Sequence, residues 1–155
     1  MLLCFFGDLE ASKHKPIGRV QAMKKALAAT VSLFTKKVNQ MDAGSESGTI
    51  YGAGIIIDPA GYIVTSAHNL QPNIPPIVKL STGQEVASEV IGSDTATDLA
   101  VIKITGELPF PHLKWAKKAG VLGQDIFIIG SPFGLENSVS MGIVSAPHRV
   151  LASTE

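Results

Sequence analysis

Two side chains able to move a proton together stand thirty residues apart in this sequence. His68 ends the run Thr65-Ser66-Ala67-His68, just after an apolar, strand-like segment, and Asp98 directly precedes the apolar run 99–104. A general base that activates a hydroxyl nucleophile is an imidazole whose tautomer and orientation are fixed by a carboxylate. A separation that spans one hairpin can bring these side chains together, so His68 and Asp98 are candidates for that chemistry.

The same two residues also fit ordinary structural roles. A histidine at a strand end is usually a partly exposed polar residue, and an aspartate before a strand is usually a turn or cap residue. Spacing alone therefore leaves both interpretations of His68 and Asp98 open.

The elements that must position these residues follow from hydrophobic periodicity. Apolar residues at helical spacing predict an amphipathic helix over residues 17–29 that packs one face on the domain. This apolar stripe consists of Ile17, Val20, Met23 and Leu27. A strand is expected at 31–34, and the polar stretch 41–48 is typical of a loop.

From Thr49 onward the pattern changes to short apolar runs separated by turn residues. Such a pattern favours an all-β sandwich or barrel over alternating β and α units. Asp58-Pro59-Ala60-Gly61 predicts a hairpin turn, because proline presets one turn dihedral and glycine tolerates a positive φ. Strands are expected at residues 55–57, 62–64, 77–80, 85–90, 99–104, 125–130 and 139–145.

Three longer motifs carry a resemblance to a known family. Residues 51–70, YGAGIIIDPAGYIVTSAHNL, resemble the stretch that ends at the catalytic histidine of the HtrA (Deg, or Do-like) serine proteases. Residues 94–104, DTATDLAVIKI, resemble the family's catalytic-aspartate segment, and residues 130–145 resemble the first hairpin of its second barrel. The motifs stand in the family's order, and the resemblance extends over residues 17–149.

By this resemblance the chain has a chymotrypsin-like fold, a pair of β-barrels with the active site between them. His68 is then the general base and Asp98 its orienting carboxylate, in peptide-bond hydrolysis by a Ser-His-Asp triad. Asp94 is the nearby acidic rival, and the Asp-Leu-Ala context favours Asp98. The resemblance also implies unfolded or misfolded polypeptides as substrates and assembly into trimers through the protease domain.

The sequence departs from the family at the third triad residue. The family's nucleophile lies in a Gly-Asn-Ser-Gly-Gly stretch whose backbone N–H groups also form the oxyanion hole, and no such stretch occurs before Glu155. We therefore expect a chain truncated before the nucleophile serine and inactive by itself as a peptidase. None of the serines in the C-terminal region is followed by glycines that would build such a hole. These serines are Ser131, Ser138, Ser140, Ser145 and Ser153.

The expected organisation has three parts. Residues 1–16 form an N-terminal tail, residues 17–119 the helix and a complete first barrel that carries the histidine and aspartate, and residues 120–155 only the opening strands of a second barrel. We expect the family's peptide-binding PDZ domain to be absent. A partial barrel exposes strand edges and apolar side chains, which predicts poor solubility or a partner that supplies the missing strands. The side chains expected to be exposed include Ile128, Ile143 and Val144.

Two other interpretations stay beside the endopeptidase. The chain could be a non-catalytic regulatory or chaperone-like binding partner of full-length HtrA-type subunits, in a homo- or hetero-oligomer. It could also be an incomplete gene product with no stable fold. A soluble, oligomeric and proteolytically silent chain would favour the binding partner, and protease sensitivity would favour the incomplete product.

Composition bounds the remaining possibilities. The chain of 155 residues is 45% hydrophobic and 17% charged, as expected for one globular domain. Its single cysteine, Cys4, excludes an internal disulfide framework. The histidines lack metal-ligand spacing and no glycine-rich loop precedes a helix, so neither a metal nor a cofactor is expected. These histidines are His14, His68, His112 and His148.

Charge and targeting signals leave the compartment undetermined. Residues 13–37 hold seven Lys and Arg and no acid, whereas the rest of the chain has a net charge of −7. We interpret the basic stretch as a solvated helix face and expect no nucleic-acid partner. Its lack of acidic residues is shared with organelle (chloroplast or mitochondrion) transit peptides, while neither a secretory signal nor a membrane span is predicted. Trp115, which stands among lysines, is expected to anchor a core.

Overall fold

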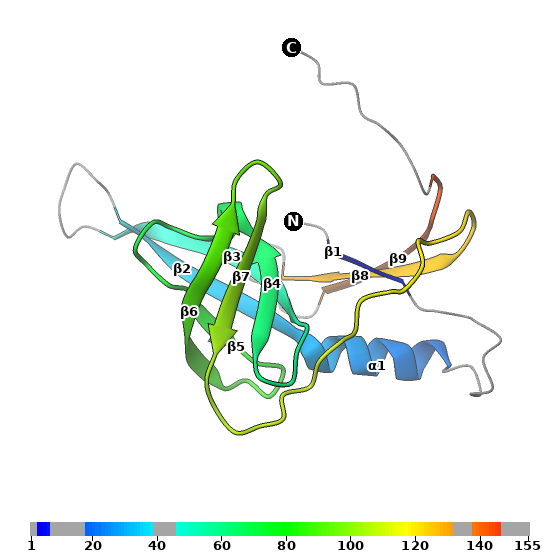
Figure 1. Ribbon diagram of the computed structural model, residues 1–155, viewed down its shortest axis with the longest axis horizontal. Helices are drawn as coiled ribbons and strands as arrows, with labels where there is room; N and C mark the ends of the chain where they lie inside the picture. Colours follow the sequence, from blue (N-terminus) through cyan, green and yellow to red (C-terminus); the bar gives the residue numbers. More distant parts are fainter. Residues whose placement is uncertain (1–2, 7–17, 39–45, 132–137, 147–155) are drawn as a thin grey trace, which may run out of the picture.

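The computed structural model describes residues 3–6, 18–38, 46–131 and 138–146, and these are mostly β-strands (Figure 1). Their order confirms the prediction of an all-β fold with a helix near the N-terminus. The elements are β1 (Leu3–Phe6), α1 (Arg19–Ala29), β2 (Thr30–Val38), β3 (Glu46–Ile56), β4 (Tyr62–Ser66), the 3₁₀ turn η1 (Ala67–Asn69), β5 (Ile77–Lys79), β6 (Glu85–Asp94), β7 (Leu99–Ile104), β8 (Asp125–Gly130) and β9 (Ser138–Ile143).

Six antiparallel strands close into a barrel in the order β2-β3-β4-β7-β6-β5. The barrel closes where β5 pairs with β2, in a register that sets Val78 opposite Leu33. Closure satisfies the backbone edges of both strands, because each edge finds a partner within the barrel. The first barrel of the chymotrypsin-like fold is therefore complete.

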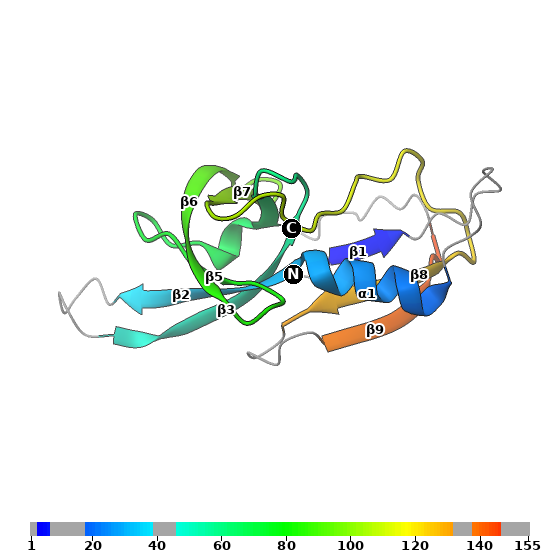
Figure 2. The same ribbon diagram turned by 90° about the horizontal axis from the view of Figure 1, so that it is seen from below.

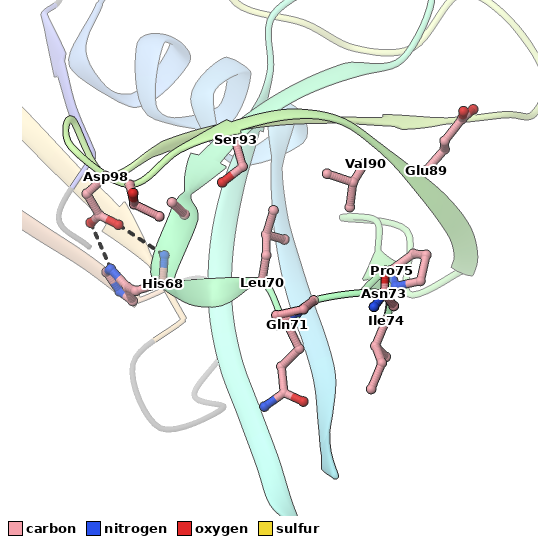
Figure 3. A pocket seen from close by; sticks show the side chains of 13 residues that line it. His68, Leu70, Gln71, Asn73, Ile74, Pro75, Glu89, Val90, Ser93 and Asp98 are labelled. Carbon is pink, nitrogen blue, oxygen red and sulfur yellow. Dashed lines mark hydrogen bonds and ion pairs between the residues drawn. The ribbon is translucent and has the colours of Figure 1, made fainter. Parts of the chain in front are cut away.

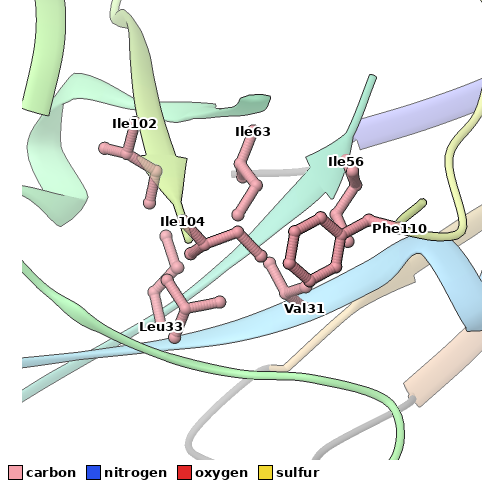
Figure 4. Close-up of a cluster of buried hydrophobic side chains, with 8 residues drawn as sticks. Val31, Leu33, Ile56, Ile63, Ile102, Ile104 and Phe110 are labelled. Atoms are coloured by element: carbon pink, nitrogen blue, oxygen red, sulfur yellow. The ribbon is translucent and has the colours of Figure 1, made fainter. Parts of the chain in front are cut away.

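The barrel is filled by one cluster of buried apolar side chains, most of them β-branched or leucine (Figure 4). Fully burying one such side chain contributes about 1.5–3 kcal/mol to folding. Phe110 comes from the loop after β7 and covers one end of the cluster. The members are Val31, Leu33, Ile56, Ile63, Val78, Ile102, Ile104 and Phe110.

The local patterns that predicted these strands are visible in β7 and in the turn before β4. Ala100, Ile102 and Ile104 are buried and alternate with more exposed residues, as expected for a strand with one face in the core. In the turn, Gly61 has φ 92, and a Cβ atom there would lie 2.7 Å from the carbonyl oxygen of Ile104. Only glycine fits this position, so the predicted hairpin has a steric cause.

A three-stranded sheet in the order β1-β8-β9 lies beside the barrel, and α1 runs along it (Figure 2). A second buried cluster joins sheet, helix and barrel. Its members are Ala26, Ala29, Ile55, Leu113, Phe127 and Ile129. At the other end of the helix, Arg19 donates a 2.6 Å hydrogen bond to Asp125 of β8. The sheet therefore buries its apolar face with the help of both α1 and the barrel.

Two segments expected to lack regular structure form strands. Leu3–Phe6, assigned to the tail, form β1 and pair antiparallel with β8, so that Leu3 is opposite Ile129. β9 takes only one edge of β8, and an extended segment from a distant part of the chain can pair with the other. Residues 46–48, expected in the polar loop, begin β3 and pair with the end of β2.

The apolar stripe of the helix was only partly correct. Val20 is 67% exposed, whereas Ala26 and Ala29 are buried. The helix approaches its neighbours closely near its C-terminal end, where small side chains permit contact. Ile17 lies outside the described residues. No helix in the described part of the chain is long and apolar enough to cross a bilayer.

Two other expectations about burial were wrong. Trp115 is 68% exposed and anchors no core, because Phe110 and Leu113 of the same loop fill the two clusters. Val144 is buried, since its backbone N–H bonds to Gln124 and holds it against the sheet end. Ile143 is exposed, as expected.

Candidate functional site

The ends of two paired strands bring the candidate base and carboxylate together. The register of β4 and β7 sets Ser66, the last residue of β4, opposite Leu99, the first residue of β7. Because η1 follows β4 at once, His68 and Asp98 leave the sheet at the same edge. Figure 3 shows the two side chains in contact there.

Asp98 contacts His68 through both carboxylate oxygens. Its Oδ2 lies 2.7 Å from the ring Nδ1, and its Oδ1 accepts a 3.0 Å hydrogen bond from the backbone N–H of His68. The backbone N–H of Ala67 donates to the carbonyl oxygen of Asp98 at 3.1 Å. An ionised carboxylate can only accept, so in the neutral ring Nδ1 carries the proton and Nε2 presents its lone pair. The His68 side chain is 57% exposed, so a reacting group can approach the ring.

The surroundings of Asp98 favour its charged form. The backbone N–H of His68 is the main cause that lowers the pKa of the Asp98 carboxyl, against partial desolvation, which raises it. Hydrogen bonds from the His68 ring and the Ser66 side chain lower this pKa further. Asp98 has a left-handed backbone with φ 54, which aspartate tolerates better than most residues. In this conformation both its main chain and its carboxylate meet η1.

Asp94, the acidic rival, is the last residue of β6, and its side chain bonds to the turn that leads to β7. Its Oδ1 accepts the backbone N–H of Ala96 at 3.0 Å, and its Oδ2 accepts the hydroxyl of Thr97 at 2.7 Å. The bond from the Thr97 hydroxyl is the main cause that lowers the pKa of Asp94. The structure therefore brings Asp98 to the histidine and uses Asp94 as a turn cap.

Two hollows meet at His68. The larger has a volume of about 810 Å³ and lies between residues 70–75 and β6, with Asp98 at its edge (Figure 3). The smaller has a volume of about 450 Å³ and lies between β3 and the three-stranded sheet. We call the smaller hollow the inter-sheet cleft. An extended polypeptide in this cleft would pass His68.

Three of the five C-terminal serines line the inter-sheet cleft, namely Ser131, Ser138 and Ser140. Ser131 is 6% exposed, and its hydroxyl shares a 2.7 Å hydrogen bond with that of Ser32 in β2. This bond ties the end of β8 to the barrel. Ser145 is exposed beyond β9, and Ser153 lies outside the described residues.

His112, the other histidine that the structure describes, does not join the site. The Nδ1 of His112 donates to the carbonyl oxygen of Phe110 at 3.1 Å in the loop after β7. His14 and His148 lie outside the described residues. Within the described ranges, no three His, Cys, Asp or Glu side chains gather in a way that could hold a metal ion.

Sequence patterns did not point to the polar residues behind His68. Asn69 is 4% exposed and belongs to a chain of hydrogen bonds that runs through Thr65 to β3. Ser66 adds a hydrogen bond to Asp98. The available signal was a run of small and polar residues, Thr65, Ser66 and Asn69, around a histidine at a strand end.

Comparisons with known proteins agree with this geometry. The family described as "Trypsin-like peptidase domain" matches residues 52–154. A probable periplasmic serine endoprotease, DegP-like, of Halomonas elongata is 43% identical over 108 residues, which cover 69% of this chain and 23% of that protein. Serine endoprotease DegS of Escherichia coli is 31% identical over 145 residues, which cover 92% of this chain and 41% of DegS.

The fold is also similar to a solved structure, that of the serine endoprotease from Yersinia pestis. The two chains superpose with a TM-score of 0.70 at 28% identity, over 86% of this chain and 46% of the other. The chain thus spans less than half the length of the curated relatives described above.

Proposed function

Since this chain belongs to the trypsin-like peptidase family, in its HtrA/Deg (Do-like) group, we propose that it carries the acid-base half of a serine endopeptidase site. His68 is the general base, and Asp98 is the carboxylate that orients it. The double contact of Asp98 with His68 supports this most directly. A carboxylate that holds Nδ1 selects the tautomer whose Nε2 can accept a proton.

The reaction proposed is peptide-bond hydrolysis by acyl transfer. A serine hydroxyl attacks the peptide carbonyl carbon, and Nε2 of His68 takes the hydroxyl proton as the C–O bond forms. Asp98 stabilises the resulting imidazolium. Nε2 then gives the proton to the leaving nitrogen as the C–N bond breaks, and water releases the acyl group by the same proton transfers. The substrates are unfolded or misfolded polypeptides, whose extended backbone suits the inter-sheet cleft.

No serine of these 155 residues is proposed as the nucleophile. The hydroxyl of Ser131 is already bonded to Ser32, and the Gly-Asn-Ser-Gly-Gly stretch of the family does not occur in the sequence. We assign residues 17–119 to the helix and first barrel and residues 120–155 to the opening of a second barrel. Without a triad serine and oxyanion hole, turnover falls by many orders of magnitude. The 155-residue polypeptide is therefore inactive by itself.

A second function, as a regulatory or chaperone-like binding partner of HtrA-type subunits, is favoured by one observation. Two large apolar side chains of β9, Met141 and Ile143, and Leu122 in the turn before β8 are 57–71% exposed. Apolar surface exposed over one region of a protein is typical of an interface. In this proposal the chain assembles with such subunits, as a homo- or hetero-trimer, or holds unfolded chains.

A paired assay tests the proposed inactivity and the binding function. The purified 155-residue protein and its His68→Ala variant are treated with a fluorophosphonate probe and incubated with unfolded casein, while aggregation of a heat-denatured client is followed by light scattering. We expect no labelling and no cleavage. Suppression of aggregation by both forms would support the binding function. Labelling or cleavage that requires His68 would show that one of the serines present is a nucleophile, and the proposed inactivity would be wrong.

A further inference from the structure

Asn69 is a buried polar residue directly behind the proposed base. It ends η1, follows His68 in the chain and is only 4% exposed. A buried carboxamide costs free energy unless its donors and acceptors are paired, so such a residue is retained where its bonds fix a structure. The hydrogen-bond partners of Asn69 show which part of the structure it stabilises.

Hydrogen bonds tie Asn69 to three strands of the barrel. Its Nδ2 donates to the hydroxyl of Thr65 in β4 at 3.1 Å, and that hydroxyl donates to the carbonyl oxygen of Ala53 in β3 at 2.8 Å. The hydroxyl of Thr35 in β2 donates to the main-chain carbonyl of Asn69 at 3.1 Å. Both hydroxyl-bearing residues are fully buried, which makes these bonds hard to exchange for water.

The carboxamide of Asn69 fits because residue 52 has no side chain. A Cβ atom on Gly52 would lie 2.5 Å from Cγ of Asn69, 2.7 Å from its Nδ2 and 2.9 Å from its Oδ1. Any larger residue at position 52 would displace this carboxamide. Gly52 also lines the inter-sheet cleft, together with His68 and Asn69. The space that the Asn69 carboxamide occupies is therefore next to the proposed reaction site.

These contacts hold η1 in addition to those made by Asp98. Asp98 bonds to the backbone N–H groups of Ala67 and His68, and the Asn69 network anchors the next residue to the barrel. We propose that Asn69 is a positioning residue that keeps the His68 ring against Asp98. This inference rests on the proposed function, because positioning matters only if His68 is the base.

The test is proton NMR of the 155-residue protein, which observes the pair without needing turnover. An Nδ1 proton held by a carboxylate gives a resolved low-field signal, assigned here by its loss in His68→Gln and its persistence in His112→Gln. We expect Asn69→Ala and Gly52→Ala to lose this signal through exchange with water. We expect Thr65→Val, which removes the linking hydroxyl, to lose it too, and Thr65→Ser to retain it.

Ile102→Ala is the matched control for general destabilisation. Ile102 is fully buried in the main cluster, and its truncation disturbs the core without removing a member of the Asn69 network. Circular dichroism establishes which variants fold. A folded Asn69→Ala or Gly52→Ala protein that keeps the signal would overturn the proposal, and so would its loss in Ile102→Ala. If Asn69→Ala does not fold, Gly52→Ala and the Thr65 pair decide by the same signal.

The failure of the proposed function is distinguishable from the failure of this inference. If the wild-type protein shows no low-field signal, no carboxylate protects an Nδ1 proton of His68 from exchange with water, and both proposals fall. If the signal is present and insensitive to Asn69, only the positioning role is wrong.

Discussion

Asp98 holds His68 at two points, with one carboxylate oxygen 2.7 Å from the ring Nδ1 and the other 3.0 Å from the backbone nitrogen. The two bonds differ in what they constrain. The bond to the ring selects the tautomer of His68. The bond to the backbone nitrogen fixes the position of the turn that carries the ring. Their common origin in one side chain means that a single substitution at residue 98 disturbs both.

Asp98→Asn should reverse the tautomer of His68. An asparagine amide turned toward Nδ1 donates a hydrogen bond, so Nδ1 becomes the acceptor and the ring proton moves to Nε2. The ¹⁵N shifts of the His68 ring at neutral pH measure this directly, and Asp94→Asn is the matched control at a carboxylate that does not touch the ring. An unchanged His68 tautomer in Asp98→Asn would show that the carboxylate does not select it.

Acid should weaken the fold partly through Asp98 and Asp94. The pKa of each carboxyl is lowered in the folded protein, so each contributes stability at pH values above its unfolded-state pKa. That contribution is lost as the pH falls through the lower, folded-state pKa. Urea unfolding between about pH 7 and pH 3 should show a shallower acid decline for Asp98→Asn and Asp94→Asn than for the wild type. Parallel curves would contradict this assignment.

Ile102→Ala should lower the free energy of unfolding by about 2–5 kcal/mol, because it opens a cavity in the barrel. Ile102 has no exposed surface and belongs to the main cluster. Ile91→Ala is the matched control, since Ile91 lies in β6 and is 50% exposed. Its cost should be about 0.5 kcal/mol or less. If urea denaturation gave the same loss of unfolding free energy for Ile102→Ala and Ile91→Ala, Ile102 would not belong to the core of the barrel.

Phe127→Ala should loosen the three-stranded sheet from the barrel. Phe127 is buried in the second cluster, and its truncation should cost about 3–5 kcal/mol. Met141 is its cross-strand partner in β9 but is 61% exposed, so Met141→Ala should cost about 0.5 kcal/mol. Thermal unfolding and limited proteolysis of residues after 120 report the two effects. A Phe127→Ala protein as stable as Met141→Ala would show that the sheet does not depend on this cluster.

Local sequence patterns predicted the barrel strands well, because alternation and turn chemistry are properties of neighbouring residues. The turn at Gly61 and the alternation in β7 are examples. β1 escaped prediction because its partner β8 lies more than a hundred residues away in the chain. Val20 was expected to be buried because it lies on the apolar face of the helix. Periodicity indicates which face can be buried, but the neighbouring elements determine how much of that face is covered.

The candidate site also contains residues that the sequence indicated and one residue that it did not. The motifs around His68 and Asp98 indicated the pair, and the structure adds that Asp94 caps its own turn. Asn69 was not anticipated, since its role depends on the absence of a side chain at Gly52 in β3. A contact between a turn and a strand that needs a glycine at one position produces no periodic pattern in the sequence.

The most direct test of the central claim supplies a serine nucleophile from a relative. Residues 1–146 are fused to the serine-bearing C-terminal part of the DegS protease domain, and cleavage of unfolded casein is measured. The acid-base assignment predicts cleavage that falls by about 10⁴-fold or more in His68→Ala and Asp98→Asn and stays close to wild type in Asp94→Asn. A folded fusion protein that cleaves casein equally well without His68, or not at all with it, would contradict the claim that His68 and Asp98 are the acid-base half of a peptidase site.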